Sequence, residues 1–218
     1  MKTGLWKVAA LATVLAFVSL STVARSDDTK GKGHGDKHPG KKHEGGEHAA
    51  KAEIGKPAPL FTLKNHDGKE VKLADYKDKI VVLEWYNINC PVCKEYTDRM
   101  KEWAKKYGEK GVVWLAIDST HNGSDSSNAA YAKKHGVTYP ILNDFDGKTG
   151  HAYGATATPH MFVIHKGTLV YAGAIDDSKG RGKATKNYVA EAIDAVMAGK
   201  PVATAQTKAF GCSVKYKK

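Results

Sequence analysis

Two cysteines separated by two residues, Cys90 and Cys93, are the strongest chemical signal in the sequence. The apolar run at 80–86 before them is typical of a buried parallel strand. Pro91 suits the first position of a helix, and 94–107 place apolar and aromatic side chains at the three- and four-residue steps of an amphipathic helix. A thiol at a helix N-terminus has a lowered pKa, because free backbone N–H groups and the helix dipole stabilise its thiolate. The sequence therefore predicts a reactive thiolate at the start of a helix.

The two cysteines are expected to differ in role. Cys90, the more exposed of the two, is the predicted nucleophile, and Cys93, one turn inside the helix, is placed to resolve the mixed disulfide that Cys90 forms. Zinc ligation by the pair is an alternative, but the predicted folded part contains no second Cys-x-x-Cys and no His-x-x-x-His pattern.

Glu84 is the one ionisable residue of the predicted strand 80–86 and lies six residues before Cys90. A carboxyl group buried there would have a raised pKa, and it could pass protons to or from Cys93. The alternative is an ordinary salt-bridged residue at a sheet edge.

The pattern around this strand predicts one α/β domain. A hairpin is expected over 54–73 with its turn at Asp67-Gly68, and Gly136 is expected to cap a helix. The polar stretch 118–128 follows the C-terminal end of a strand, where open α/β sheets bind ligands, so it is expected either to border the site or to be a solvated connection. The remaining predicted elements are strands at 112–117, 139–142 and 168–173, a loop at 156–165 that runs into a strand, and helices at 129–135 and 187–198. The strand 168–173 is expected to be the final one.

Four segments together resemble the redoxin branch of the thioredoxin superfamily, which includes thiol-specific antioxidant proteins and exported thiol–disulfide oxidoreductases. They are Lys-Pro-Ala-Pro-Leu-Phe-Thr-Leu at 56–63, Asp-Gly-Lys-Glu-Val-Lys-Leu at 67–73, the strand that leads into Cys90 and Cys93, and Thr-Pro-His-Met-Phe-Val-Ile at 158–164. The resemblance covers 53–200. It implies a thioredoxin-like α/β fold, with a central mixed sheet flanked by helices and an N-terminal β-hairpin extension.

The resemblance also implies roles for particular residues. Cys90 would be the nucleophile, Cys93 the resolving thiol and Glu84 the buried acid. A cis peptide bond is expected between Thr158 and Pro159 beside the cysteines, leaving the backbone groups of Thr158 free to pair with an extended substrate. No bound cofactor is implied.

Two positions depart from the patterns of the superfamily. Asn89 precedes the first cysteine where thioredoxins usually have Trp, which leaves the reduction potential and the redox partner open. Asn87 stands where peroxiredoxins have Thr, which argues against a dedicated peroxidase. The predicted function is an exported thiol–disulfide oxidoreductase that acts on protein disulfides and dithiols.

Two other functions stay open. One is a thiol-dependent peroxidase in which Cys90 passes through a sulfenic acid. The other is a copper- or zinc-handling protein in which His160 and a histidine-rich N-terminal segment assist the two thiolates; a plain surface histidine is the alternative for His160.

The N-terminus predicts export. Residues 1–24 combine Lys2 and Lys7 with an apolar stretch and small residues up to Ala24, as in a cleaved secretory signal peptide. The protein is therefore expected in the periplasm or outside the cell, without stable membrane insertion after cleavage. An uncleaved membrane anchor is the alternative, although the apolar stretch is short for a span.

Residues 25–51 have almost no large apolar side chains and are predicted to be a disordered linker. Spaced histidines in such a chain can bind zinc, copper or nickel, whereas a solvated tether would bind nothing. The histidines concerned are His34, His38, His43 and His48.

The chain is basic, and its formal charge of +11 falls to +9 once Lys2 and Lys7 leave with residues 1–24, which contain no acidic residue. We expect no nucleic-acid partner, because export removes the chain from nucleic acid and its lysines form no motif with interleaved aromatic residues. Weak attraction to anionic membranes or cell wall is the expected consequence.

The chain contains three cysteines, and Cys212 is the one left over. It lies in the extension 201–218, beyond the predicted domain 52–200. An unpaired cysteine in an exported protein needs an explanation. Cys212 is a small buried hydrophobe, a second resolving thiol for Cys90, or an intermolecular link.

Overall fold

A computed structural model describes residues 51–218. The predicted signal peptide 1–24 and the linker up to residue 50, with its four histidines, lie outside the described residues and stay predictions. Within 51–218, no helix has both the length and the apolar composition needed to cross a membrane.

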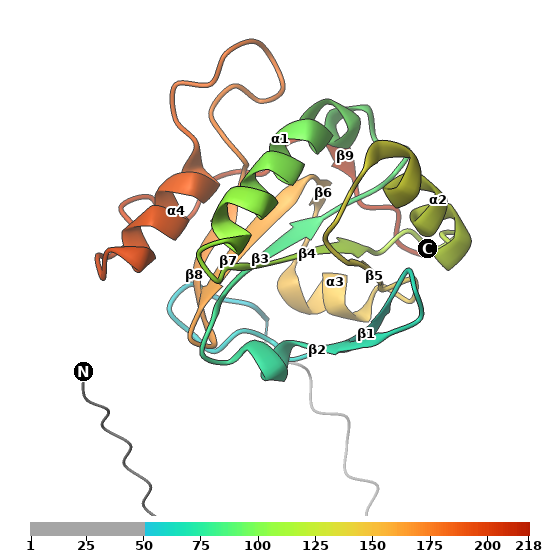
Figure 1. The fold of residues 1–218 in the computed structure, drawn as a ribbon, viewed down its shortest axis with the longest axis horizontal. Coiled ribbons are helices and arrows are strands. Elements are labelled where there is room, and N and C mark those ends of the chain that lie inside the picture. The colour runs from blue at the N-terminus through green and yellow to red at the C-terminus, as the bar shows by residue number, and fades with distance from the viewer. Residues whose placement is uncertain (1–50) are drawn as a thin grey trace, which may run out of the picture. The chain divides into compact units, whose positions relative to one another are not determined.

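A seven-stranded mixed sheet forms the centre of the fold, with strand order β2-β1-β5-β4-β3-β7-β8 (Figure 1). Strand β3 lies in its interior, parallel to β4 and antiparallel to β7. Since both faces of β3 are covered, every residue from Val81 to Trp85 is buried, as the apolar run predicted. The strands are β1 Thr62–Asn65, β2 Glu70–Lys72, β3 Ile80–Trp85, β4 Val113–Asp118, β5 Ile141–Asn143, β7 His160–His165 and β8 Thr168–Gly173.

Helices cover both faces of this sheet. Side chains from α1, α2 and α4 share one core cluster with Val82 and Met161, whereas Tyr153 of α3 joins Leu83 and Phe162 in the other. Helix α1 lies in front of the strands in Figure 1 and begins with Pro91 at its first turn, as predicted. The helices are η1 Leu73–Tyr76, α1 Pro91–Gly108, α2 Asp125–His135, α3 Lys148–Tyr153 and α4 Tyr188–Met197.

The architecture confirms the predicted fold class. It is a thioredoxin-like sheet flanked by helices, with the β1–β2 hairpin added at one edge. The expected turn at Asp67-Gly68 joins the hairpin, where the side chain of Asn65 accepts hydrogen bonds from the backbone N–H groups of Asp67 and Lys69.

Three elements differ from the sequence prediction. Helix α2 begins at Asp125, four residues earlier than expected, because the Ser124 side chain accepts a hydrogen bond from the Ser127 N–H and caps it. The short helix α3 was missed, and the strand 168–173 is not the final one. A second, two-stranded sheet pairs β6 (Ala157–Thr158) with β9 (Cys212–Ser213) of the C-terminal extension.

Candidate active site

Cys90 is held at the junction between β3 and α1. It is the N-cap residue of the helix, with extended backbone angles, and its N–H donates to the carbonyl oxygen of Asn87 at 3.0 Å. The Asn87 side chain folds this loop by accepting from the Asn89 N–H at 2.7 Å and donating to the Thr120 hydroxyl at 2.8 Å. Asn87 therefore fixes the loop that presents Cys90, a role that the sequence did not reveal.

The Cys90 sulfur has two close neighbours from distant parts of the chain. It lies 3.0 Å from the carbonyl oxygen of Thr158 and 2.8 Å from the sulfur of Cys212. Cys90 is 2% exposed, so it is the more open of the two cysteines, as expected, but only by a small margin because the C-terminal extension covers it. Cys93, one turn into α1, is completely buried.

The Thr158–Pro159 peptide bond is cis, as the resemblance implied, and both residues lie beside the cysteines. The expectation that the Thr158 backbone is free is wrong. Thr158 pairs with Cys212 in the antiparallel β6–β9 ladder, as Ala157 does with Ser213.

The three thiols have different proton affinities. A hydrogen bond from the Cys93 thiol is the main reason that the pKa of Cys90 falls to about 4; burial opposes this, and Cys212 assists it. Burial, reinforced by the neighbouring Cys90, raises the pKa of Cys93 well above its ordinary value. Burial and Cys90 raise the pKa of Cys212 as well. At neutral pH the site thus holds one thiolate, on Cys90, flanked by two protonated thiols.

Glu84 lies inside the sheet, 1% exposed, on the core face that also holds Cys93. The alternative of a salt-bridged residue at a sheet edge is wrong, because β3 is an interior strand and the carboxyl group accepts a hydrogen bond at 3.0 Å from the neutral indole of Trp114. Burial raises its pKa to about 7, against the hydrogen bonds of Trp114 and Tyr139. Its charge in turn raises the pKa of Cys93. A group of this kind can exchange a proton near neutral pH.

His160 lies on the opposite face of the sheet. Its neighbour Met161 pairs with Glu84 and belongs to the core of the cysteine face, and successive residues of a strand point to opposite sides. The His160 ring instead packs 4.4 Å from the ring of Phe162. The hypothesis that His160 joins Cys90 and Cys93 at a metal is therefore wrong. In the part of the chain that the structure describes, no group of three His, Cys, Asp or Glu side chains is placed to hold a metal ion.

A pocket of about 280 Å³, lined mainly by polar residues and called the polar pocket below, has Cys90 in its wall. The stretch after β4 contributes Thr120 and Asn122, so this part of the predicted polar loop does border the site. The full lining is Asn87, Asn89, Cys90, Thr120, Asn122, Cys212 and Lys215. The sequence pointed to the loop through its place after a strand, but it gave no sign that the C-terminal extension forms the opposite wall.

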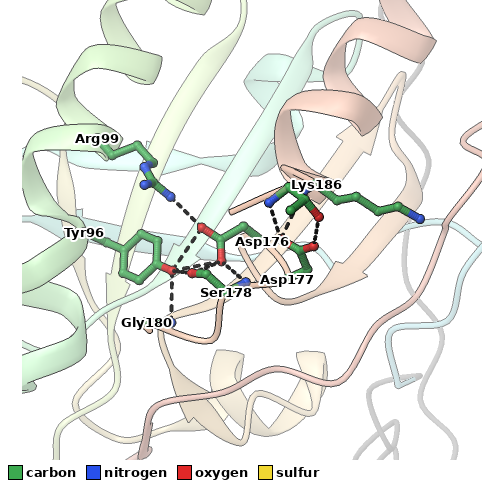
Figure 2. Close-up of polar contacts among 8 residues, drawn as sticks. Tyr96, Arg99, Asp176, Asp177, Ser178, Gly180 and Lys186 are labelled. Carbon is green, nitrogen blue, oxygen red and sulfur yellow. Dashed lines mark hydrogen bonds and ion pairs between the residues drawn. The ribbon is translucent and has the colours of Figure 1, made fainter. Parts of the chain in front are cut away.

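An ionic cluster around a buried carboxylate holds the segment that follows β8 against α1 (Figure 2). The Asp176 side chain, fully buried, accepts from Arg99 at 2.5 Å and from the Tyr96 hydroxyl at 2.9 Å. The same hydroxyl accepts from the Gly180 N–H at 3.2 Å, and the Tyr96 ring packs 6.0 Å from the ring of Phe210. This cluster, which the sequence did not predict, supports α1 one turn after Cys93 and provides a surface for the C-terminal extension.

Fold and site together define a thioredoxin-like protein with a pair of thiols at a helix start. The chain belongs to the AhpC/TSA family, whose pattern matches residues 54–172, within the thioredoxin superfamily.

Curated and solved relatives agree with this assignment. The thiol-disulfide oxidoreductase ResA of Bacillus thuringiensis subsp. konkukian (strain 97-27) is 34% identical over 116 residues, which are 53% of this chain and 66% of ResA. The match thus spans just under two thirds of that relative. An uncharacterised conserved protein from Geobacillus kaustophilus aligns with a TM-score of 0.70 at 31% identity, over 76% of this chain and 93% of that one. A hypothetical protein from Sinorhizobium meliloti 1021 aligns with a TM-score of 0.69 at 29% identity, over 76% and 95%.

Proposed function

We propose that this protein is an exported thiol–disulfide oxidoreductase that uses Cys90 and Cys93 on protein disulfides and dithiols. The observation that carries the proposal is geometric: Cys90 caps the N-terminus of α1, and Cys93 is buried in the first turn of the same helix. The lowered pKa of Cys90 and the raised pKa of Cys93 suit a nucleophile and a resolving thiol. Similarity to ResA, which is named for this activity, supports the same conclusion.

The reductive half-reaction starts at Cys90. Its thiolate attacks one sulfur of a substrate disulfide, forms a mixed disulfide and expels the other substrate sulfur as a thiolate. The Cys93 thiol then loses its proton, for which the buried Glu84 carboxylate is the acceptor on the same face of the sheet. The Cys93 thiolate attacks the Cys90 sulfur and releases the second substrate thiol. Two electrons reach the substrate, and a Cys90–Cys93 disulfide remains.

Export is the second part of the proposal. It is supported by the signal-peptide pattern of residues 1–24, since an oxidising compartment is where disulfide exchange has protein substrates. A separate redox partner must then return the Cys90–Cys93 disulfide to the dithiol. Secretion of a full-length fusion to a reporter enzyme, compared with one lacking residues 1–24, tests this part: equal export of both would contradict it.

The activity is tested with a protein disulfide reporter and two variants of the full chain. We expect Cys90→Ser to lower the rate of reporter reduction at least about 100-fold, because the only thiolate of the site is removed. We expect Cys93→Ser to accumulate a mixed disulfide between Cys90 and the reporter. Full activity in Cys90→Ser would refute the proposed function.

Peroxide reduction is the second candidate, and the 2.8 Å between the sulfurs of Cys90 and Cys212 favours it, because Cys212 could condense with a Cys90 sulfenic acid. The two activities are separated by the second-order rate constants of the reduced protein with hydrogen peroxide and with a disulfide. A faster reaction with peroxide would make peroxide reduction, rather than disulfide exchange, the better-supported function.

A further inference from the structure

The C-terminal segment, residues 204–218, lies where an extended substrate would have to bind. Its strand β9 adds to the edge of β6, with Cys212 opposite Thr158, and the Val214 N–H donates to the Thr156 carbonyl oxygen at 3.3 Å. Adding a strand to an exposed edge is a common way in which proteins bind extended peptides. The segment therefore makes, from within the chain, the backbone contacts that a substrate would make.

A thiol of this segment faces the nucleophile. The sulfurs of Cys90 and Cys212 are 2.8 Å apart, whereas a disulfide bond measures about 2.05 Å. In a mixed disulfide, the substrate cysteine must take this same position against Cys90 and the Thr158 backbone.

Gly211 allows this close approach. Its φ of +125° is rarely adopted by residues with a side chain, and a Cβ atom there would overlap the carbonyl group of Thr158. Only glycine lets the backbone before Cys212 lie so near the edge of β6.

Contacts on both sides of Cys212 dock the segment. Before it, the Thr207 N–H donates to the Ala172 carbonyl oxygen at 3.0 Å. After it, the His121 N–H donates to the Lys215 carbonyl oxygen at 2.9 Å, and the Tyr216 hydroxyl donates to the Ala155 carbonyl oxygen at 2.8 Å. The Tyr216 ring also stacks 4.1 Å from the ring of His151. Cys212 itself is half-buried on a two-residue strand, so the segment is anchored at points outside the reacting thiol.

We propose that the C-terminal segment is an internal substrate strand: Cys212 is a third redox thiol that exchanges a disulfide with Cys90, and the segment must leave β6 before a protein disulfide can bind. The inference rests on the proposed function, because it assigns Cys212 the place of a substrate cysteine in that reaction.

The exchange balances with a small disulfide, which leaves β9 in place, as the oxidant. The Cys90 thiolate attacks the disulfide and releases one thiolate, which leaves a mixed disulfide on Cys90. Cys212, deprotonated by the released thiolate, attacks the Cys90 sulfur, forms a Cys90–Cys212 disulfide and releases the second thiolate. Cys93, having lost its proton to the Glu84 carboxylate, then attacks the Cys90 sulfur, which forms the Cys90–Cys93 disulfide and returns Cys212 as a thiolate. Two electrons leave the protein in the first two steps, and the third only moves the disulfide.

The segment would affect large and small substrates differently. A protein disulfide needs the β6 edge and so competes with β9. A small disulfide such as glutathione disulfide can approach Cys90 through the polar pocket without pairing with Thr158.

The first experiment maps disulfides in full-length Cys93→Ser after stoichiometric glutathione disulfide. Trypsin places Cys90 in the peptide 80–94 and Cys212 in 209–215, so a link between them has a unique mass. We expect this link to be the main product, and expect Cys212→Ser in the same background to keep glutathione on Cys90 instead. Glutathione retained on Cys90 while Cys212 stays free would overturn the inference but leave the proposed function intact. No reaction at Cys90 would contradict the proposed function itself.

The second experiment loosens the segment without changing a thiol. Tyr216→Ala removes both the ring stacking and the hydroxyl contact, and the matched control Tyr216→Phe keeps the ring. We expect Tyr216→Ala to lower KM for a protein disulfide about fivefold, with Tyr216→Phe between it and the parent, and expect KM for glutathione disulfide to change less than twofold. An unchanged KM for the protein disulfide would overturn the substrate-strand part of the inference.

Discussion

Cys93 and Cys212 both face the Cys90 sulfur, but they belong to regions of very different stability. Cys93 lies in the first turn of an 18-residue helix and is completely buried. Cys212 lies on a strand of two residues at the rim of the fold. Withdrawing Cys93 would require unwinding α1, whereas withdrawing Cys212 breaks a short ladder and a few anchoring contacts. The site thus combines one permanent and one removable thiol partner.

The largest expected effect is a difference in kcat between variants that lack Cys93 and variants that lack Cys212. Cys93→Ala should lower kcat for a protein disulfide about 100-fold, because mixed disulfides then have no resolving thiol in the helix. Cys212→Ala should change kcat less than threefold, since the helix still resolves them. Steady-state kinetics with one reporter measures both, and equal losses would show that the partners are equivalent.

A smaller effect is expected at Glu84, which accepts the proton of Cys93 but not that of Cys212. Burial raises its pKa to about 7, so the carboxyl group is neutral below that pH and becomes a proton acceptor above it. The rate at which Cys93 resolves a Cys90–glutathione disulfide should therefore rise as the pH passes through 7, and Glu84→Gln should remove this rise and slow resolution about tenfold at pH 8.

The control is the Cys93→Ser background, in which only Cys212 can resolve the same disulfide. Stopped-flow measurement of glutathione release should give rates there that do not respond to Glu84→Gln. An equal response in both backgrounds would mean that Glu84 acts on Cys90 rather than on Cys93.

The smallest effect concerns the thiolate itself. The pKa of Cys90 is lowered to about 4, first by the hydrogen bond from Cys93 and to a lesser degree by that from Cys212. A lowered pKa means that the thiolate persists as the pH falls from 9 toward 4, so alkylation by iodoacetamide should stay fast at pH 6. Cys93→Ala should shift the midpoint of the rate profile upward, and Cys212→Ala should shift it upward by less. The reverse order would make Cys212 the stronger donor.

Local patterns were enough to predict the central part of the fold. The apolar run of β3, Pro91 at the start of α1 and the turn at Gly68 each depend on a few adjacent residues. The same local reasoning placed Cys90 at a helix start and Glu84 inside the sheet. It therefore predicted most of the part of the site that β3 and α1 form.

The other half of the site depends on contacts that no local pattern encodes. Strand β9 is two residues long and pairs with residues more than fifty positions earlier, so it has no periodicity of its own. The hypothesis that placed His160 beside the thiols was wrong for a related reason. Both faces of β7 are buried, so its apolar residues do not reveal which face His160 occupies.

Because Cys212 is attached to the chain that carries Cys90, its encounter with the nucleophile does not depend on how dilute the protein is. A tethered group of this kind acts at an effective concentration on the order of millimolar. Free thiols in the surroundings must exceed that level to compete for a disulfide on Cys90. Under the proposed export, which would place the protein in a large and variable volume, the segment would give the active site a constant thiol environment of its own.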